Sequence, residues 1–394
     1  MAVALRGLVG YRYAILGAGR QGTAAAYDLA VNGDADSVIV ADINAAAART
    51  SATRVNMLSG GNAAKPAKVD VTTRASVLAL LSGVDAFISA VPYRFNEQLA
   101  TWAVAAKVSM VDLGGNTAIV RKELSLRAAA KRAGITIVPD CGMGPGANIT
   151  LAVYAMGLLD AATEVRIYDG GLPQRPRPPW NYEMLFHVEG LVNEYAGSAT
   201  FLRGGKPVEV PALTEPEELT IPPLGTLEAL VTSGGLSTMP WTYAGRLRTL
   251  ENKTLRYPGH WAQVRAFADL GLFSEEPVLI RGKPVVPRDV FGALFEPRAS
   301  SEDPRDVAVT RVVCTGERNG RRARAVVDLV DYYDARTGFR AMERVTGWHA
   351  SIVAAMVARG EIPPGAHSVE KGVPPTRFVE EARRRGLAVR TRVT

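Results

Sequence analysis

The feature that most constrains this chain is a glycine-rich turn between an apolar run and an Ala-rich run near its N-terminus. The apolar segment 13–16 is followed by Gly17-Ala18-Gly19-Arg20-Gln21-Gly22 and then by the Ala-rich segment 23–30. In such a turn the first glycine permits the tight bend, the second lets the backbone approach a pyrophosphate, and the third allows the helix to pack on the strand. The N-terminus of the helix then favours an anion. The spacing therefore predicts a dinucleotide-binding unit rather than a turn that only connects two elements.

The first 140 residues alternate short apolar runs with Ala-rich stretches. Near-continuous apolar runs are typical of strands that are buried on both faces, and the stretches between them are typical of helices. The alternation predicts an α/β fold class, a Rossmann doubly wound parallel sheet. The expected strands end at Leu16, Ala41, Val71, Ser89, Asp112 and Val138.

The remainder of the chain is mixed and strand-rich. The runs 307–315 and 323–332 flank Asn319-Gly320, which is a strong hairpin signal, and residues 378–393 suggest a helix and then a strand. A chain of 394 residues is long enough for two domains with separate cores. We expect an NAD-binding Rossmann domain over residues 1–145, a mixed α+β substrate-binding and dimerisation domain over 146–345, and a C-terminal return to the Rossmann domain over 346–394.

Composition excludes several classes of protein. The net charge is +7, but the charges are dispersed, and the run Arg383-Arg384-Arg385 is expected to be the solvated face of a terminal helix rather than a nucleic-acid contact. Cys141 and Cys314 are too few for a disulfide framework, which is typical of a reducing cytoplasm. No apolar stretch reaches the length of a membrane span, and the histidines lack metal-ligand spacing. We expect a cytoplasmic protein that uses no metal and binds neither nucleic acid nor membrane.

The cofactor site is expected along the carboxyl ends of the strands. Asp42 ends the second strand, where an acid accepts hydrogen bonds from the ribose hydroxyls and repels a 2′-phosphate, so NAD is favoured over NADP. Arg20 and Arg49 act against this preference, because either could pair with a phosphate. Asp70 could reach the adenine or be an ordinary exposed acid. The expected cofactor-binding residues are Gly17, Ala18, Gly19, Arg20, Gln21, Gly22, Asp42, Asp70, Ala90, Val91, Pro92, Gly114 and Gly115.

Six segments together resemble the saccharopine dehydrogenase/lysine 6-dehydrogenase family, and within it the lysine 6-dehydrogenases most. They are the segments 112–116, 139–146, 170–174, 189–195, 232–238 and 255–260. The resemblance implies NAD-dependent oxidative deamination of L-lysine at the ε-carbon, with a product aldehyde that cyclises to 1-piperideine-6-carboxylate. It also implies a homodimer or a higher homo-oligomer.

This chemistry requires a free amine, because hydride leaves a carbon that bears nitrogen only when the nitrogen is deprotonated. A site for it needs a base or an apolar wall near the amine, and an arginine fork is the natural partner for the substrate carboxylate. Several candidates also have a structural alternative: a salt bridge for Arg256, a packed histidine for His260, a turn-capping acid for Asp140 and an ordinary turn for the loop at 233–238. The candidate catalytic residues are Asp140, His187 and His260, and the candidate substrate-binding residues are Tyr93, Asn96, Asn116, Ser233, Thr238 and Arg256.

Two other functions stay open. A saccharopine reductase or a carboxynorspermidine-type enzyme would handle a related carbon–nitrogen bond, and its substrate, which carries additional carboxylates, would favour a pocket with several arginines. A non-catalytic NAD-binding regulator would bind the cofactor and turn over no amine.

Overall fold

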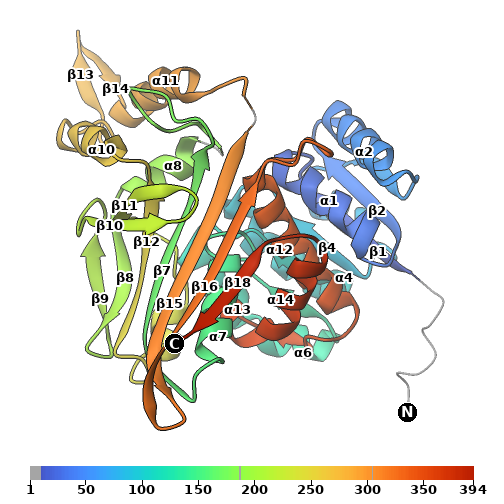
Figure 1. Ribbon diagram of the computed structural model, residues 1–394. Helices are drawn as coiled ribbons and strands as arrows, with labels where there is room; N and C mark the ends of the chain where they lie inside the picture. Colours follow the sequence, from blue (N-terminus) through green and yellow to red (C-terminus); the bar gives the residue numbers. More distant parts are fainter. Residues whose placement is uncertain (1–9, 186–187, 304) are drawn as a thin grey trace. The chain divides into compact units, whose positions relative to one another are not determined.

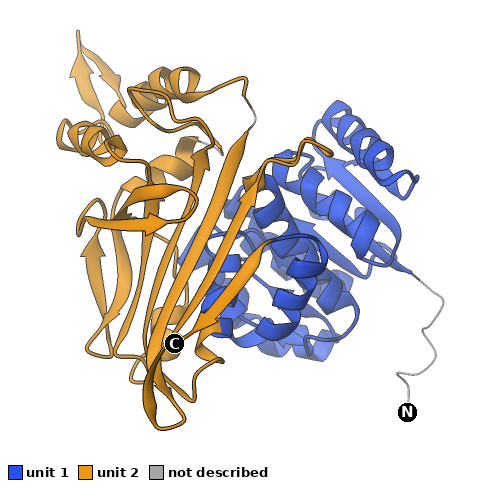
Figure 2. Cartoon of the chain, viewed as in Figure 1, with its two compact units in different colours: residues 1–154, 343–387 blue, residues 155–342, 388–394 orange. Residues whose placement is uncertain are grey.

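The computed structural model describes residues 10–185, 188–303 and 305–394, and the chain divides into two compact units (Figure 2). Unit 1 comprises Met1–Tyr154 and Glu343–Leu387, and unit 2 comprises Ala155–Met342 and Ala388–Thr394. The chain therefore returns to the first unit at Glu343. The return ends at Leu387, because the final strand belongs to unit 2.

In the described residues of unit 1, seven parallel strands form one sheet in the order β17-β6-β5-β4-β1-β2-β3 (Figure 1). This is the predicted doubly wound sheet, and the fold class is confirmed. The order reverses between β1 and β4, and the crevice at such a reversal is where ligands bind in open α/β sheets. The strands are β1 (Tyr11–Leu16), β2 (Ala35–Asp42), β3 (Ala64–Lys68), β4 (Ala86–Ser89), β5 (Ser109–Asp112), β6 (Thr136–Val138) and β17 (Gly365–Ala366).

Helices of unit 1 pack their small apolar side chains against this sheet. Ala24, Ala25 and Ala26 are buried on the first helix, so the Ala-rich sequence permits close helix–strand packing. The helices are α1 (Arg20–Asn32), α2 (Ala45–Ser59), α3 (Arg74–Leu80), η1 (Tyr93–Phe95), α4 (Asn96–Ala106), α5 (Thr117–Ser125), α6 (Arg127–Ala133), α7 (Ala147–Met156), α12 (Ala341–Ala358), α13 (Val369–Gly372) and α14 (Pro375–Arg384).

The third strand is shorter than predicted. It ends at Lys68 rather than at Val71, because Asp70 starts a turn in which its side chain accepts hydrogen bonds from the amide and hydroxyl groups of Thr72 at 2.9 and 2.6 Å. An aspartate that bonds to the backbone two residues ahead favours a turn over a continuing strand.

The prediction that residues 383–385 form a solvated basic face is wrong for one of the three residues. Arg383 and Arg384 are exposed, whereas the side chain of Arg385 is fully buried. Its Nε donates to both carboxylate oxygens of Asp28 on α1 at 2.8 Å, and its Nη1 donates to Glu381. The buried carboxylate of Asp28 requires a counter-charge, and α14 supplies it.

Unit 2 is built on a mixed sheet that contains nine strands in the described part of the chain. The main order is β10-β11-β12-β7-β15-β16-β18, and β8 pairs with both β12 and β9. The predicted hairpin is confirmed as β15–β16, where Asn319 and Gly320 have positive φ angles of 53° and 69°. The strands are β7 (Ala161–Pro173), β8 (Ser198–Arg203), β9 (Lys206–Pro211), β10 (Glu217–Ile221), β11 (Gly225–Val231), β12 (Thr249–Arg256), β15 (Asp306–Arg318), β16 (Arg321–Tyr332) and β18 (Val389–Val393).

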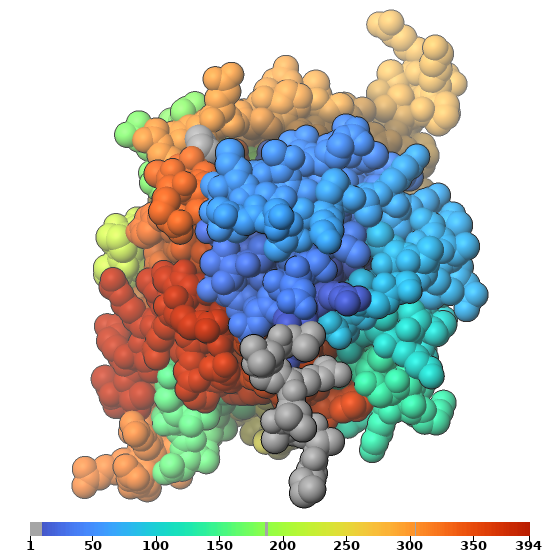
Figure 3. Space-filling model, turned by 90° about the vertical axis from the view of Figure 1, so that its right-hand side faces the viewer, coloured from blue at the N-terminus to red at the C-terminus, as the bar shows by residue number. Residues whose placement is uncertain are grey.

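A small two-stranded sheet and short helices complete unit 2. The hairpin of β13 (Val278–Ile280) and β14 (Lys283–Val285) projects from the surface of this unit (Figure 3). It leaves Leu279 77% exposed, with Val278 and Ile280 also exposed. The helices are α8 (Val188–Tyr195), α9 (Met239–Tyr243), α10 (His260–Asp269) and α11 (Pro287–Ala299).

Candidate functional site

The glycine turn of unit 1 has the geometry that a dinucleotide phosphate requires. Gly17 has a φ of 108°, and a Cβ there would lie 2.6 Å from the carbonyl oxygen of Ala90 after β4, so only glycine fits. A Cβ on Gly22 would collide with the backbone of Gly17, whereas a Cβ on Gly19 would meet nothing within 4 Å. Gly19 is also the N-cap of α1 and has no side-chain cap. The turn therefore leaves open space beside uncapped helix amides, which suits a pyrophosphate.

Asp42 lies next to this turn, at the carboxyl end of β2. Its Oδ2 accepts a hydrogen bond from the amide of Ala18, and its Oδ1 accepts one from the amide of Asn44, both at 2.8 Å. The carboxylate is half-buried and fixed in place by these two amides, and each oxygen retains a second lone pair for a ribose hydroxyl. The side-chain oxygen of Gln21 is buried beside the turn and has no hydrogen-bond partner among the described residues.

The loops after β4, β5 and β6 meet at the same edge of the sheet. Gly115, at a φ of 124°, lies against the ring of Tyr93, and a Cβ on Gly114 would collide with the side chain of Asp140. Asp140 itself has a φ of 64°, which is uncommon for a residue other than glycine. The structure thus brings together Tyr93, Gly114, Gly115 and Asp140, which the sequence placed in three separate loops.

Three predicted residues of unit 1 have local structural partners. The Oδ1 of Asn96 accepts a hydrogen bond from the hydroxyl of Ser89 at 2.7 Å, in a position that is 2% exposed. Asn116 caps α5 by accepting hydrogen bonds from the amides of Ala118 and Ile119. Asp70 is held in its turn, and the hydroxyl of Thr72 lowers the pKa of its carboxyl group. These contacts favour a structural role for the three side chains.

Arg256 is the centre of a polar cluster in unit 2, at the end of β12. It is 2% exposed, and its guanidinium lies over the rings of Tyr182 and Trp261 at 5.0 and 5.7 Å. Its Nη1 donates to the carbonyl oxygen of Leu255 at 3.0 Å, and its Nη2 is 3.6 Å from a carboxylate oxygen of Glu194. A guanidinium in this position has a carboxylate at one side and aromatic walls at the others.

His260 is fixed by hydrogen bonds on both ring nitrogens. Its Nδ1 is 3.0 Å from the carbonyl oxygen of Trp180, so this nitrogen carries the hydrogen and donates it. The hydroxyl of Tyr195 therefore donates to Nε2 at 3.0 Å, and Nε of Arg256 donates to the same hydroxyl at 3.4 Å. Burial, assisted by Arg256, lowers the pKa of His260 to about 3. The geometry favours the packed structural histidine over a proton acceptor.

Glu194 is an acid of this cluster that the sequence analysis did not place in the site, because it could equally be a surface helix end. Its side chain is 31% exposed, and burial raises its pKa to about 7, although Arg256 acts in the opposite direction. A carboxyl group that titrates near neutral pH can exchange a proton with a substrate. The only signal for Glu194 in the sequence was its place in the segment 189–195, where an acid at a helix end is normally a solvated residue.

The loop after β11 is tied to the same helix end. The amide of Ser233 donates to the carbonyl oxygen of Glu194 at 2.9 Å, and the Ser233 hydroxyl donates to the carbonyl oxygen of Asn193 at 2.5 Å. Thr238 is 8% exposed and precedes α9. Ser233 is therefore linked to the cluster by hydrogen bonds to the backbone of α8. The third candidate catalytic residue, His187, lies outside the described residues.

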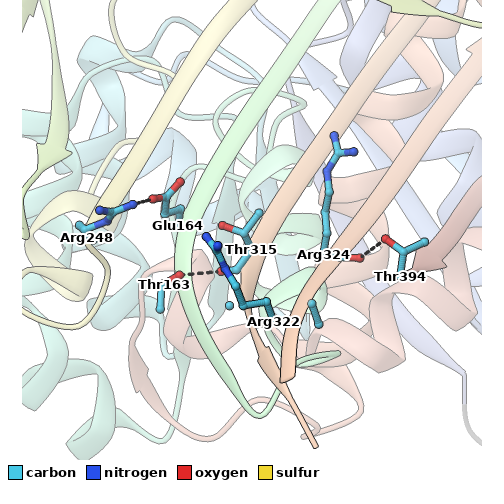
Figure 4. Close-up of a pocket in the computed structure, with 9 residues that line it drawn as sticks. Thr163, Glu164, Arg248, Thr315, Arg322, Arg324 and Thr394 are labelled. Atoms are coloured by element: carbon cyan, nitrogen blue, oxygen red, sulfur yellow. Dashed lines mark hydrogen bonds and ion pairs between the residues drawn. The ribbon is translucent and has the colours of Figure 1, made fainter. Parts of the chain in front are cut away.

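A separate cavity of about 370 Å³ lies at the opposite ends of β7 and β12 from Arg256 (Figure 4). In this cavity Arg248 points to Glu164, and Glu164 also forms an ion pair with Arg166. Two further arginines that line it, Arg322 and Arg324, are exposed. No residue predicted for the site lines this cavity. We interpret it as a solvated cluster of ion pairs at the sheet end.

Comparisons with known proteins identify the family. The family model described as the saccharopine dehydrogenase NADP binding domain matches residues 13–138, and the saccharopine dehydrogenase C-terminal domain matches residues 142–387. The chain belongs to the saccharopine dehydrogenase family. The resemblance of the six segments to the family is therefore confirmed, and so is a nicotinamide dinucleotide cofactor. The greater likeness to lysine 6-dehydrogenases and the preference for NAD stay predictions.

Individual relatives of the family are distant. The chain is 25% identical to the saccharopine dehydrogenase (NADP+, L-glutamate-forming) of Pyricularia oryzae over 296 residues, which are 72% of this chain and 64% of that protein. It therefore spans less than two thirds of that relative. The solved structure of the apo saccharopine dehydrogenase from Saccharomyces cerevisiae has a TM-score of 0.79 at 21% identity and covers 98% of this chain and 100% of that one. A homospermidine synthase of Legionella pneumophila in complex with NAD has a TM-score of 0.64 at 12% identity, with 98% and 92% covered.

The described residues offer neither a membrane-spanning helix nor a metal-ligand cluster. Among these residues no helix is both long and apolar enough to cross a membrane. Within the same ranges no group of three or more histidine, cysteine or acidic side chains could hold a metal ion.

Proposed function

We propose that this family member catalyses NAD-dependent oxidative deamination of L-lysine at the ε-carbon, with cyclisation of the product to 1-piperideine-6-carboxylate. The observation that carries the proposal is the Arg256–Glu194 pair. An α-amino acid presents a carboxylate and an ammonium group on one carbon, and the pair presents the opposite charges 3.6 Å apart. Arg256 would bind the α-carboxylate, and Glu194 would face the α-ammonium group.

The reacting amine must lose its proton before hydride can leave. For a lysine side chain with an ordinary pKa of about 10.4, deprotonation at pH 7 costs about 4–5 kcal/mol. When bound, the nicotinamide cofactor accepts the hydride. The chain's own contribution in unit 2 is to bind the amino-acid head group between Arg256 and Glu194 and to surround Arg256 with the rings of Tyr182 and Trp261.

The pH dependence of activity tests this proposal. With purified protein, NAD and L-lysine, NADH formation is expected to rise about tenfold per pH unit from about pH 7 towards about pH 10, because the free amine increases by that factor. NADH is measured by its near-ultraviolet absorbance, with L-norleucine, which lacks the ε-amine, as the control substrate. Turnover of L-norleucine at a similar rate would contradict reaction at the ε-carbon.

A second candidate function is a saccharopine reductase or a carboxynorspermidine-type reaction. The saccharopine dehydrogenase activity of the Pyricularia oryzae relative favours it. Saccharopine carries more carboxylates than lysine, so it would need further cations beside Arg256, whereas one guanidinium suffices for the single carboxylate of lysine. Activity with saccharopine and none with lysine would select this candidate. Cofactor binding without turnover of either would select the non-catalytic regulator.

The preference for NAD has its own test. Asp42→Asn keeps one acceptor oxygen for the turn and removes the charge that repels a 2′-phosphate. The ratio of kcat/KM for NAD to that for NADP is expected to fall at least about tenfold, which corresponds to about 1.4 kcal/mol. Asp36→Asn, an exposed acid on the same strand, is the control. An unchanged ratio would mean that Asp42 does not face the ribose.

We further propose that the protein is a cytoplasmic homodimer assembled through unit 2. The exposed apolar side chains of the β13–β14 hairpin support this assembly, because a two-stranded sheet is marginal alone and large exposed apolar groups mark contact surfaces. Light scattering on the purified protein measures the mass directly.

A further inference from the structure

Two acidic residues of unit 1 that have no part in the proposed reaction are buried beneath the cofactor edge of the sheet. Asp112 ends β5, and Glu123 lies on α5, the helix that follows the Gly114–Gly115 turn. Both are 0% exposed. Oδ2 of Asp112 and both carboxyl oxygens of Glu123 are buried with no donor group bonded to them among the described residues. The two carboxyl groups are close enough to share a hydrogen bond, which requires a proton on one of them. Such a pair cannot carry two charges, because a buried unpaired carboxylate is costly.

The remaining contacts determine which member is ionised. Oδ1 of Asp112 accepts hydrogen bonds from the amides of Gly114 and Asp140 at 2.7 and 3.2 Å, so Asp112 is the better-stabilised anion. Burial first, and then the charge of Asp112, raise the pKa of Glu123 far above its usual range. Asp140 and Glu97 act in the same direction, and Glu97 is itself paired with Lys122 at 2.7 Å. At neutral pH the pair therefore holds one proton, on Glu123.

Asp112 in turn joins two loops. Its side chain accepts hydrogen bonds from the amides of Gly114 and Asp140. Its backbone carbonyl accepts another from the amide of Cys141 at 2.7 Å. Asp140 has a left-handed backbone, a conformation that persists only where the surroundings impose it. The hydrogen bond from its amide to Asp112 is one such restraint.

We propose that Glu123 is a positioning residue: as a neutral carboxylic acid it donates its proton to Asp112 and thereby holds the loops after β5 and β6 along the edge where the nicotinamide cofactor binds. The inference rests on the proposed function only for the place of the cofactor. It assigns Glu123 no contact with substrate. A carboxamide can replace the acid in this role, since its NH2 group donates the same hydrogen bond without titrating.

The test compares Glu123→Gln with Glu123→Leu in the full-length protein. Glu123→Gln is expected to bind NADH within about twofold of the parent, whereas Glu123→Leu leaves Asp112 without its donor and weakens binding about 10- to 100-fold. NADH fluorescence titration measures both. If the leucine variant bound NADH like the parent, or if glutamine were as damaging as leucine, the proposal would be overturned.

A second measurement is independent of ligands and of the leucine variant. In the folded state Glu123 keeps its proton, whereas in the unfolded chain Glu123 loses it at pH values above the ordinary pKa of a glutamate. The free energy of unfolding of the parent therefore falls as pH rises from the ordinary pKa of Glu123 towards its raised pKa in the folded state. Glu123→Gln carries no such proton. Urea unfolding gives the unfolding constant of each protein. Between about pH 7 and about pH 9 the ratio of the parent's unfolding constant to that of Glu123→Gln is expected to increase by up to tenfold per pH unit. A constant difference would overturn the proton assignment. If the parent bound no dinucleotide at all, the proposed function would be wrong, whereas urea unfolding would still test whether Glu123 carries the proton.

Discussion

Replacing Arg256 with glutamine is expected to raise KM for L-lysine about 100-fold and to leave the affinity for NAD unchanged. The variant loses a charge-assisted pair with the substrate carboxylate, which is worth about 3 kcal/mol in a buried site. It also removes the cation from beside Glu194, so the pKa of Glu194 should rise above its present value of about 7. Steady-state kinetics and NADH titration separate the two effects. Arg256→Lys, which keeps the charge and loses the fork, should recover part of the loss.

Arg311 provides the matched control for Arg256. It is also an arginine of the unit 2 sheet, and it binds both oxygens of Asp328 at 2.6 and 3.0 Å. Arg311→Gln should reduce stability without a change in KM. If KM rose equally in both variants, or if NAD affinity fell with Arg256→Gln, the assignment of Arg256 to the substrate carboxylate would be wrong and the structural salt bridge would be the better interpretation.

The largest expected effect on stability is that of Arg385. Arg385→Leu should lower the free energy of unfolding of unit 1 by about 3–5 kcal/mol at neutral pH, because it leaves the buried carboxylate of Asp28 without its cation. Asp28 would retain a hydrogen bond from the hydroxyl of Ser351 at 2.5 Å. Thermal and urea unfolding of the full chain measure the loss.

Arg383→Leu is the control for this prediction, since Arg383 is the exposed arginine two positions earlier. An exposed arginine contributes about 0–1 kcal/mol, so the variant should unfold close to the parent. Equal losses in the two variants would contradict the burial of Arg385. The double variant Asp28→Asn with Arg385→Leu should recover stability, because it removes both charges together.

Local sequence determined the architecture of unit 1. The glycine spacing at residues 17–22 and the continuous apolar runs that end at Leu16 and Asp112 describe interactions over a few residues, and such patterns are visible without tertiary information. The Asn319-Gly320 turn belongs to the same class, because the positive φ angles that it needs are a local property of those two residues.

Only the tertiary structure decided which polar residues act together. Arg256 and Glu194, Asp28 and Arg385, and Asp112 and Glu123 are each brought into contact by packing between different elements. The sequence presented Arg385 as part of a basic run and Glu194 as a helix-end acid, because nothing in a linear pattern records burial. Charge state depends on desolvation and on partners from other elements, so the chemistry of these side chains is a property of the fold.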